Sequence, residues 1–154
     1  MRLRLEVTGA KEAAAALRAQ AVVPAEKLGA VLDALAGHLV TVWQGHIRRA
    51  EGPDGPWPAL KPATRAIRRW YGHPADEPRL IRSGDFPNSI RLLSRDRSSL
   101  RVGTDMAIAR VLDKGGTWTD DAGTREVQAF PFDYLTDTER EELVGIVEDL
   151  LVVA

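Results

Sequence analysis

The chain has 154 residues, of which 44% are hydrophobic and 28% charged, with a net charge of −1 and no cysteine. This length and apolar content fit one globular domain over residues 1–154 that buries roughly two thirds of its unfolded surface. Disulfides and thiolate metal sites are excluded, and no stretch approaches the roughly 20 apolar residues of a membrane-spanning helix.

The first 49 residues predict a strand and two helices. Apolar and polar residues alternate over residues 2–8, as in a half-buried strand, and the alanine-rich stretch 10–21 predicts a short helix. Pro24 suits the first turn of a second helix. Apolar side chains recur at spacings of three and four from Leu28 to Ile47, which predicts an amphipathic helix of roughly seven turns.

The next segment is rich in turn residues. Glycine and proline fill five of the eight positions 51–58, which ends the long helix and predicts an irregular loop. A short helix is expected within residues 64–71. Segment 51–78 as a whole is long for a loop, and such loops are often functional. Residues 83–89 predict a turn followed by a single helical turn.

The following residues predict short strands. Segments 90–93 and 100–103 are expected to pair as a hairpin, since the residues between them are polar. Residues 106–112 fit either a helix or a strand. An exposed excursion is expected at residues 115–123, with a strand returning over 124–130.

A capping box marks the start of the last helix. Thr136 is suited to cap the first turn, and Glu139 completes the box three residues later. The buried stripe of this helix is predicted to consist of Leu143, Ile146, Val147, Leu150 and Leu151.

Charge is distributed unevenly along the chain. Residues 48–101 carry 12 basic and six acidic side chains, whereas residues 102–154 carry four basic and 12 acidic ones. Opposite charges on two parts of one molecule allow head-to-tail contacts between identical subunits, and two solvated faces explain the same distribution. The arginines beside Trp70 and Tyr71 also allow nucleic-acid binding, but a pI near 6.3 is low for a dedicated binder.

The histidines form no catalytic or metal-binding pattern. His38 and His46 lie eight residues apart on one predicted helix, about 12 Å along its axis, which is too far for two ligands of one ion. His73 near Asp76 and Glu77 suggests an acid–base pair, but no nucleophile or oxyanion site accompanies it. We expect no enzymatic activity, no metal site and no cofactor.

Aromatic and basic side chains in turn-rich sequence are better candidates for contacts with a partner. Each aromatic one also fits its own core, but the loops are long enough that part of the set is expected to be buried between subunits. The candidate assembly interface consists of Trp57, Leu60, Arg65, Arg68, Arg69, Trp70, Lys114, Trp118, Phe130 and Phe132.

Several short motifs follow one another in order between residues 57 and 132. They are Trp57-x-x-Leu60 followed by Thr64, Leu80-x-x-Ser83-Gly84-x-Phe86 followed by Ser89-Ile90, Val102-Gly103, and Gly115-Gly116. In this order and spacing, the motifs resemble those of the phage virion morphogenesis family, the tail-completion proteins of Mu-like and related tailed phages.

The chain departs from the family pattern at two places. Where the family commonly shows Tyr-Ala-x-Ile-His before the Gly-Gly pair, this chain has Ile108 and Leu112 in place of the tyrosine and the histidine. The family's Pro-x-Arg-Pro-Phe-Leu pattern appears at residues 128–133 without the arginine and the final leucine. The resemblance is therefore to a divergent member, in which no catalytic histidine is preserved.

The resemblance implies an α+β fold, in which the long helix and the C-terminal helix pack on a small, mainly antiparallel sheet with long irregular loops. It implies a structural virion protein of the tail or neck, made in the host cytoplasm, that completes or terminates the tail. Such a protein forms a ring, a hexamer by analogy with the tails of these phages, at the head-proximal end of the tail tube.

The partners that follow are further copies of the chain, the tail tube protein and the neck or connector proteins. No membrane is involved, and DNA is only passing cargo in the lumen of the ring. Two alternatives stay open. One is a head-side connector or stopper in the neck, and the other is a small nucleic-acid-binding protein that uses the arginine-rich segment 48–101.

Overall fold

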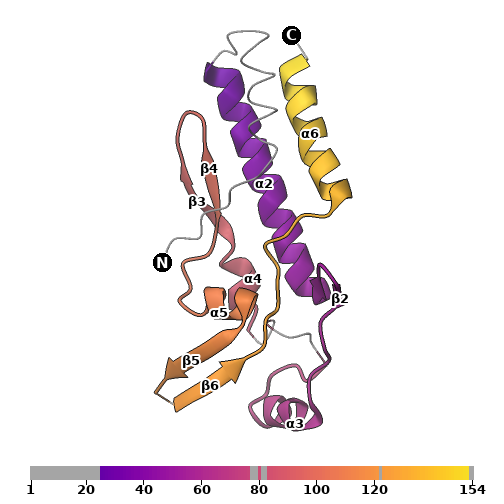
Figure 1. Cartoon of the computed structure of the whole chain (residues 1–154), viewed down its shortest axis with the longest axis vertical. Coiled ribbons are helices and arrows are strands. Elements are labelled where there is room, and N and C mark those ends of the chain that lie inside the picture. Colours follow the sequence, from indigo (N-terminus) through magenta and orange to yellow (C-terminus); the bar gives the residue numbers. More distant parts are fainter. Residues whose placement is uncertain (1–24, 77–79, 81–82, 122, 153–154) are drawn as a thin grey trace.

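Helix α2 (Ala25–Arg49) forms the long axis of the structure (Figure 1). This computed structural model describes residues 25–76, 80, 83–121 and 123–152. The strand predicted at residues 2–8 and the helix predicted at 10–21 lie outside these ranges.

The regular spacing of apolar residues in α2 gives the helix one strongly buried face, as predicted. Trp43 and Ile47 are 2% and 0% exposed, in the half of the helix where the core is densest. Twenty-five residues correspond to a rod of about 38 Å. The helix is therefore long enough to carry separate groups of elements along its length.

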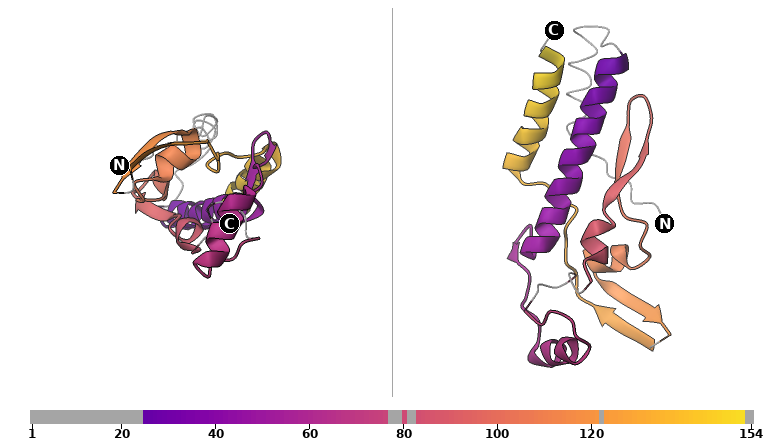
Figure 2. Two further views of the ribbon diagram at one scale, coloured as in Figure 1. Left: turned by 90° about the horizontal axis from the view of Figure 1, so that it is seen from below. Right: turned by 180° about the vertical axis from the view of Figure 1, so that it is seen from behind.

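Two elements flank α2 on opposite sides (Figures 1 and 2). On one side, β3 (Arg91–Arg95) pairs antiparallel with β4 (Leu100–Gly103), which confirms the predicted hairpin. On the other side, α6 (Asp137–Val152) runs antiparallel to α2. The C-terminal helix thus packs on α2 rather than directly on a sheet.

The turn-rich segment after α2 contains more regular structure than its sequence predicts. β1 (Glu51–Gly52) and β2 (Gly55–Pro56) form a minimal antiparallel ladder. The short helix expected within 64–71 is present as α3 (Pro62–Trp70). It begins earlier than predicted because proline, whose φ angle is fixed, is favoured in a first turn. The expected single helical turn is α4 (Asp85–Asn88).

The segment that periodicity left undecided forms a helix, α5 (Ala109–Lys114). β5 (Gly116–Asp120) and β6 (Gly123–Val127) follow as an antiparallel hairpin. Most of the exposed excursion expected at residues 115–123 therefore forms the first strand of this hairpin. Gly115 joins α5 to this hairpin with a φ of +75°, and a Cβ there would lie 3.1 Å from the backbone nitrogen of Ala129. Both the backbone angle and this close approach favour glycine in the Gly-Gly motif.

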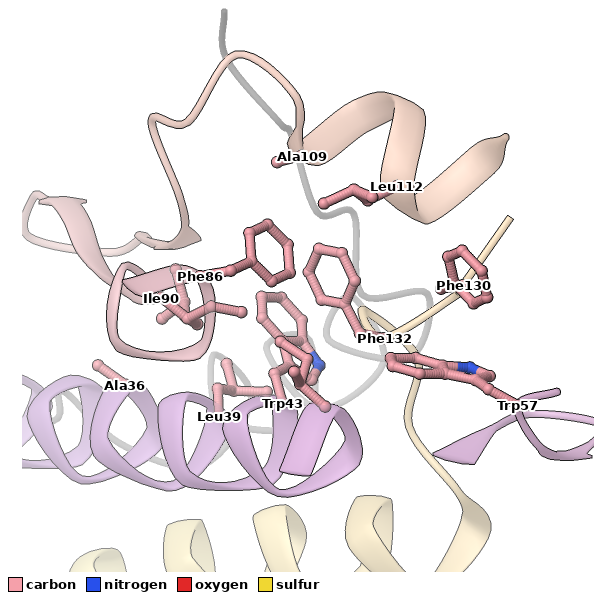
Figure 3. Packing of buried hydrophobic residues seen from close by; sticks show 12 residues of the cluster. Ala36, Leu39, Trp43, Trp57, Phe86, Ile90, Ala109, Leu112, Phe130 and Phe132 are labelled. Carbon is pink, nitrogen blue, oxygen red and sulfur yellow. The ribbon is translucent and has the colours of Figure 1, made fainter. Parts of the chain in front are cut away.

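One hydrophobic core joins the C-terminal half of α2 to segments that come much later in the chain (Figure 3). The ring of Phe132 lies edge-on to Phe86 with centroids 5.3 Å apart, and Trp57 lies edge-on to Phe130 at 5.5 Å. The cluster consists of Ala36, Leu39, Trp43, Ile47, Trp57, Phe86, Ile90, Val102, Ala109, Leu112, Phe130 and Phe132.

These elements confirm the α+β class. In the described residues, the strands form three separate two-stranded antiparallel ladders instead of one sheet. None of the described helices is both long and apolar enough to cross a lipid bilayer.

Candidate functional site

Three of the ten candidate interface residues belong to the core of the subunit itself. Trp57, Phe130 and Phe132 are 8%, 4% and 2% exposed. The Phe130 backbone nitrogen donates to the carbonyl of Leu112 at 2.6 Å, which fixes the segment before α6 against α5. These rings anchor long segments to the core of their own subunit.

Arg68 is also buried, at 7% exposed, although its helix α3 is otherwise exposed. Its guanidinium Nη1 donates to the carbonyl of Pro74 at 3.4 Å. The backbone carbonyl of Arg68 accepts from the His73 nitrogen at 2.8 Å. Both contacts hold the segment that leaves α3, so Arg68 stabilises the turn after the helix within its own chain.

The remaining candidates on α3 lie at the surface. Arg65 and Arg69 are exposed, and Trp70 is 86% exposed. Two further apolar side chains were not among the predicted site residues: Ile67 is 58% and Tyr71 68% exposed. The spacing of three and four residues between Ile67, Trp70 and Tyr71 was the signal for them, since residues so spaced share a helix face.

Lys114 lies at the base of the β5–β6 hairpin, between two carboxylates. Its Nζ is 2.5 Å from Asp113 Oδ2 and 3.4 Å from Asp133 Oδ1. The side chain of Asp113 is only 1% exposed. The hydrogen bond with Asp113 raises the pKa of Lys114, whereas burial and the negative charge of Asp113 raise the pKa of Asp133. Lys114 therefore neutralises acidic groups of its own chain.

The β5–β6 hairpin projects from the body beside α5 (Figure 1). Trp118 is half-buried on it and donates its Nε1 hydrogen to Asp120 Oδ2 at 3.0 Å. A cross-strand bond of 2.7 Å from Thr117 to Glu126 also stabilises the ribbon. The last candidate, Leu60, is half-buried in the segment before α3.

Helix α6 presents a mainly acidic surface. It carries six acidic side chains and one basic one. Its predicted buried stripe is wrong at Leu150, which is 37% exposed, and its other members are half-buried. The physical reason is that, among the described elements, α6 packs mainly along α2, which covers one side of its apolar positions. Val144, which was outside the predicted stripe, is 53% exposed.

Two histidines of α2 contact two glutamates of α6. His46, 1% exposed, places Nδ1 3.1 Å from the carbonyl of Phe132 and Nε2 2.8 Å from Glu139 Oε1. Nearer the middle of α2, His38 Nε2 lies 3.2 Å from Glu142 Oε2. Each histidine thus serves the helix–helix contact, and no group of three potential ligands is arranged for a metal in the described part of the chain.

Glu139 also closes the predicted capping box. Its Oε2 accepts from the Thr136 backbone nitrogen at 2.7 Å, and its own nitrogen donates to Thr136 Oγ1 at 3.3 Å. Partial burial raises the pKa of Glu139, but the hydrogen bonds from Thr136 and His46 outweigh it, so the pKa lies below the ordinary 4.5. The start of α6 is therefore stabilised by a carboxylate that must be ionised.

Replacing Glu139 with glutamine is expected to flatten the loss of stability in acid. In the wild-type protein, the contribution of this carboxyl is complete above about pH 4.5 and disappears as the pH falls through its lower folded pKa. The variant is expected to lose about 1–2 kcal/mol near pH 7 and little near pH 3. Urea unfolding across this range measures the difference, with Glu142→Gln as the control, and parallel curves for wild type and Glu139→Gln contradict the assignment.

One of the comparisons with known proteins gives a match. The model of the phage virion morphogenesis family matches residues 5–151, which is nearly the whole sequence. No curated protein and no solved structure gives a match. The chain therefore belongs to the phage virion morphogenesis family.

Proposed function

We propose that the protein completes or terminates the phage tail, as a ring at the head-proximal end of the tail tube that joins the tube to the neck. Family membership gives the coarser statement, a role in building the virion. The finer proposal is structural and involves no catalysis. The partners in it are further copies of the chain, the tail tube protein and the neck proteins.

The observation that carries the proposal is the exposed apolar face of α3. Ile67, Trp70 and Tyr71 are each more than half exposed, on a helix that lies at one end of the elongated subunit (Figures 1 and 2). Large exposed aromatic side chains gathered in one place mark contact surfaces, because water-exposed apolar area is unfavourable unless a partner covers it. A ring subunit requires such surfaces toward its neighbours.

A head-side connector or stopper in the neck is the second candidate in the same class. It requires the same kind of contact surface, so the exposed face of α3 supports it equally. The two roles differ in which half of the virion fails when the protein is missing.

Deletion of the gene from the parent phage is expected to leave filled heads beside detached tails. Electron microscopy of the lysate scores heads, tails and tail lengths, and a copy of the gene supplied in trans is the control. Overlong tails indicate termination, tails of normal length indicate completion, and tailless heads that have lost their DNA indicate a head-side stopper. Intact infectious particles contradict all of these roles.

Nucleic-acid binding is favoured by one specific observation, the exposure of Arg65 and Arg69 beside Trp70 and Tyr71. Arginines contact phosphates and aromatic rings stack on bases. This function requires low-micromolar affinity that falls steeply with salt. Absence of binding at about 50 mM salt excludes it.

A further inference from the structure

The outward face of α3 combines positive charge with apolar side chains. The helix contains three arginines and no acidic residue, and Arg68 is turned inward. At about 100° per residue, Trp70 lies nearly opposite Arg68, Arg69 lies about 100° from Trp70, and Arg65 lies about 40° further round, so the two arginines occupy one flank of Trp70 and Ile67 the other. No ion pair among the described residues engages Arg65 or Arg69. This basic apolar face therefore lacks a partner of opposite charge within the described chain.

An acidic counterpart exists on α6. Glu141, Val144 and Glu148 follow one another at spacings of three and four residues, so they share one face of the helix, and all three are exposed. Val144, at 53% exposed, supplies an apolar position between the two carboxylates. The face thus offers opposite charge to the arginines and an apolar contact for Trp70.

The two faces are far apart in one subunit. Figures 1 and 2 place α3 at one end of the long axis, whereas α6 runs alongside α2 toward the other end. The C-terminal half of α2 and the core around it lie between them. In this arrangement α3 does not reach the α6 helix of its own subunit.

We propose that α3 of one subunit docks on α6 of the next, and this assignment deepens the ring proposed above. Trp70 packs against Val144, and the two arginines, which both precede Trp70 along α3, lie over the acidic surface that Glu141 and Glu148 form beside Val144. The contact is heterologous, since it joins two different surfaces, and an open chain of subunits keeps one free α3 at one end and one free α6 at the other until the assembly closes. Ring formation follows when the rotation between neighbours closes on itself.

Complementary charge reversals test the docking. The Arg65→Glu/Arg69→Glu variant carries acidic groups on both faces, and the Glu141→Lys/Glu148→Lys variant carries basic groups on both. Each alone is expected to associate at least about tenfold more weakly than wild type, because like charges are opposed. Mixed in equal amounts, the two are expected to assemble again, since each α3 then meets an α6 of opposite charge.

Sedimentation of the full-length proteins at concentrations up to about 100 μM and low salt measures this association. All four side chains are exposed, so the variants are expected to melt like wild type. Arg97→Glu/Arg110→Glu is the matched control, because it changes two other exposed arginines by the same charge and is expected to assemble normally. Association that either α3 or α6 variant retains in full overturns the proposal, as does a mixture that fails to assemble.

Disulfide trapping provides an independent readout, since the natural chain has no cysteine. A chain carrying both Trp70→Cys and Val144→Cys is expected to form a ladder of linked subunits on oxidation. The two single variants mixed together are expected to stop at dimers of one with the other. The α3–α6 contact is overturned if the double-cysteine chain assembles like wild type but forms no disulfide-linked species. It is also overturned if the wild-type chain stays monomeric at every concentration tested.

The outcomes separate this contact from the proposed function and from nucleic-acid binding. A tail defect on gene deletion together with a failed charge swap leaves the function standing and removes the contact. Intact particles after gene deletion together with a successful charge swap leave the contact standing and remove the proposed function. If α3 instead grips nucleic acid, its charge reversal abolishes binding to a single-stranded oligonucleotide and the α6 variant restores nothing, which also overturns the contact.

Discussion

Replacing Phe132 with alanine is expected to lower the free energy of unfolding by about 3–5 kcal/mol, as is typical of buried aromatic residues. The side chain is 2% exposed and meets the edge of Phe86 at a centroid distance of 5.3 Å. Its neighbours come from α2, α4 and α5 and cannot all relax into the space that is left. The backbone nitrogen of Phe132 keeps its bond to Asp113 at 3.2 Å, so the loss reports side-chain packing.

Urea unfolding followed by circular dichroism measures this change. For a chain of this length, a loss of that size corresponds to a melting temperature lower by about 10 °C. Trp70→Ala is the matched control, because its ring is 86% exposed and its removal is expected to change stability by less than about 0.5 kcal/mol. Equal losses in the two variants contradict the placement of Phe132 in the core and Trp70 on the surface.

Replacing His46 with alanine is expected to destabilise the protein by about 2–4 kcal/mol. The imidazole is 1% exposed and stacks on Tyr134 with centroids 4.0 Å apart. Its removal leaves a cavity, and it leaves the carbonyl of Phe132 and the carboxylate of Glu139 without this hydrogen-bond partner. The effect therefore combines lost packing with unsatisfied polar groups.

A double-mutant cycle isolates the polar part of this effect. His46→Ala, Glu139→Ala and the combined variant are expected to give a coupling energy of about 1–2 kcal/mol. The control is the pair His38 and Glu142, whose side chains are 23% and 52% exposed, and its coupling is expected to stay below about 0.5 kcal/mol. Coupling that is equal in the two pairs contradicts the special role of His46.

The elements that sequence predicted well are those with local causes. The apolar spacing along α2 and the capping box at Thr136 and Glu139 each involve residues within one or two helical turns, and both are found as expected. The hairpin of β3 and β4 follows from a polar turn between two apolar runs. Local propensity was sufficient in all three cases.

The burial of side chains in loops was not predictable in this way. Trp57 contacts Phe130 across more than seventy positions of sequence, and the same side chain type is equally suited to a core or to a partner surface. Arg68 likewise belongs to a run of basic residues that looks uniform in sequence, yet it alone turns inward. Only the path of the chain separates these residues from Trp70.

The apolar stripe of α6 was predicted to be more buried than it is. Its periodicity correctly predicted a helix, but periodicity does not reveal how many neighbours a helix has. Among the described elements α2 covers one side of α6, and the stripe stays half-buried with Leu150 exposed. The open side of α6 was hidden from sequence reasoning for this reason, and it is the side on which the proposed subunit contact depends.

The two hydrogen bonds at Arg68 have a further consequence for association. They tie the end of α3 to residues 73 and 74, so the turn that follows the helix is already ordered in the free subunit. Conformational entropy that would otherwise be lost on contact is already lost on folding, and rigid aromatic side chains bind with a smaller entropic penalty. The end of the helix that carries Trp70 is thus ordered before a neighbour arrives.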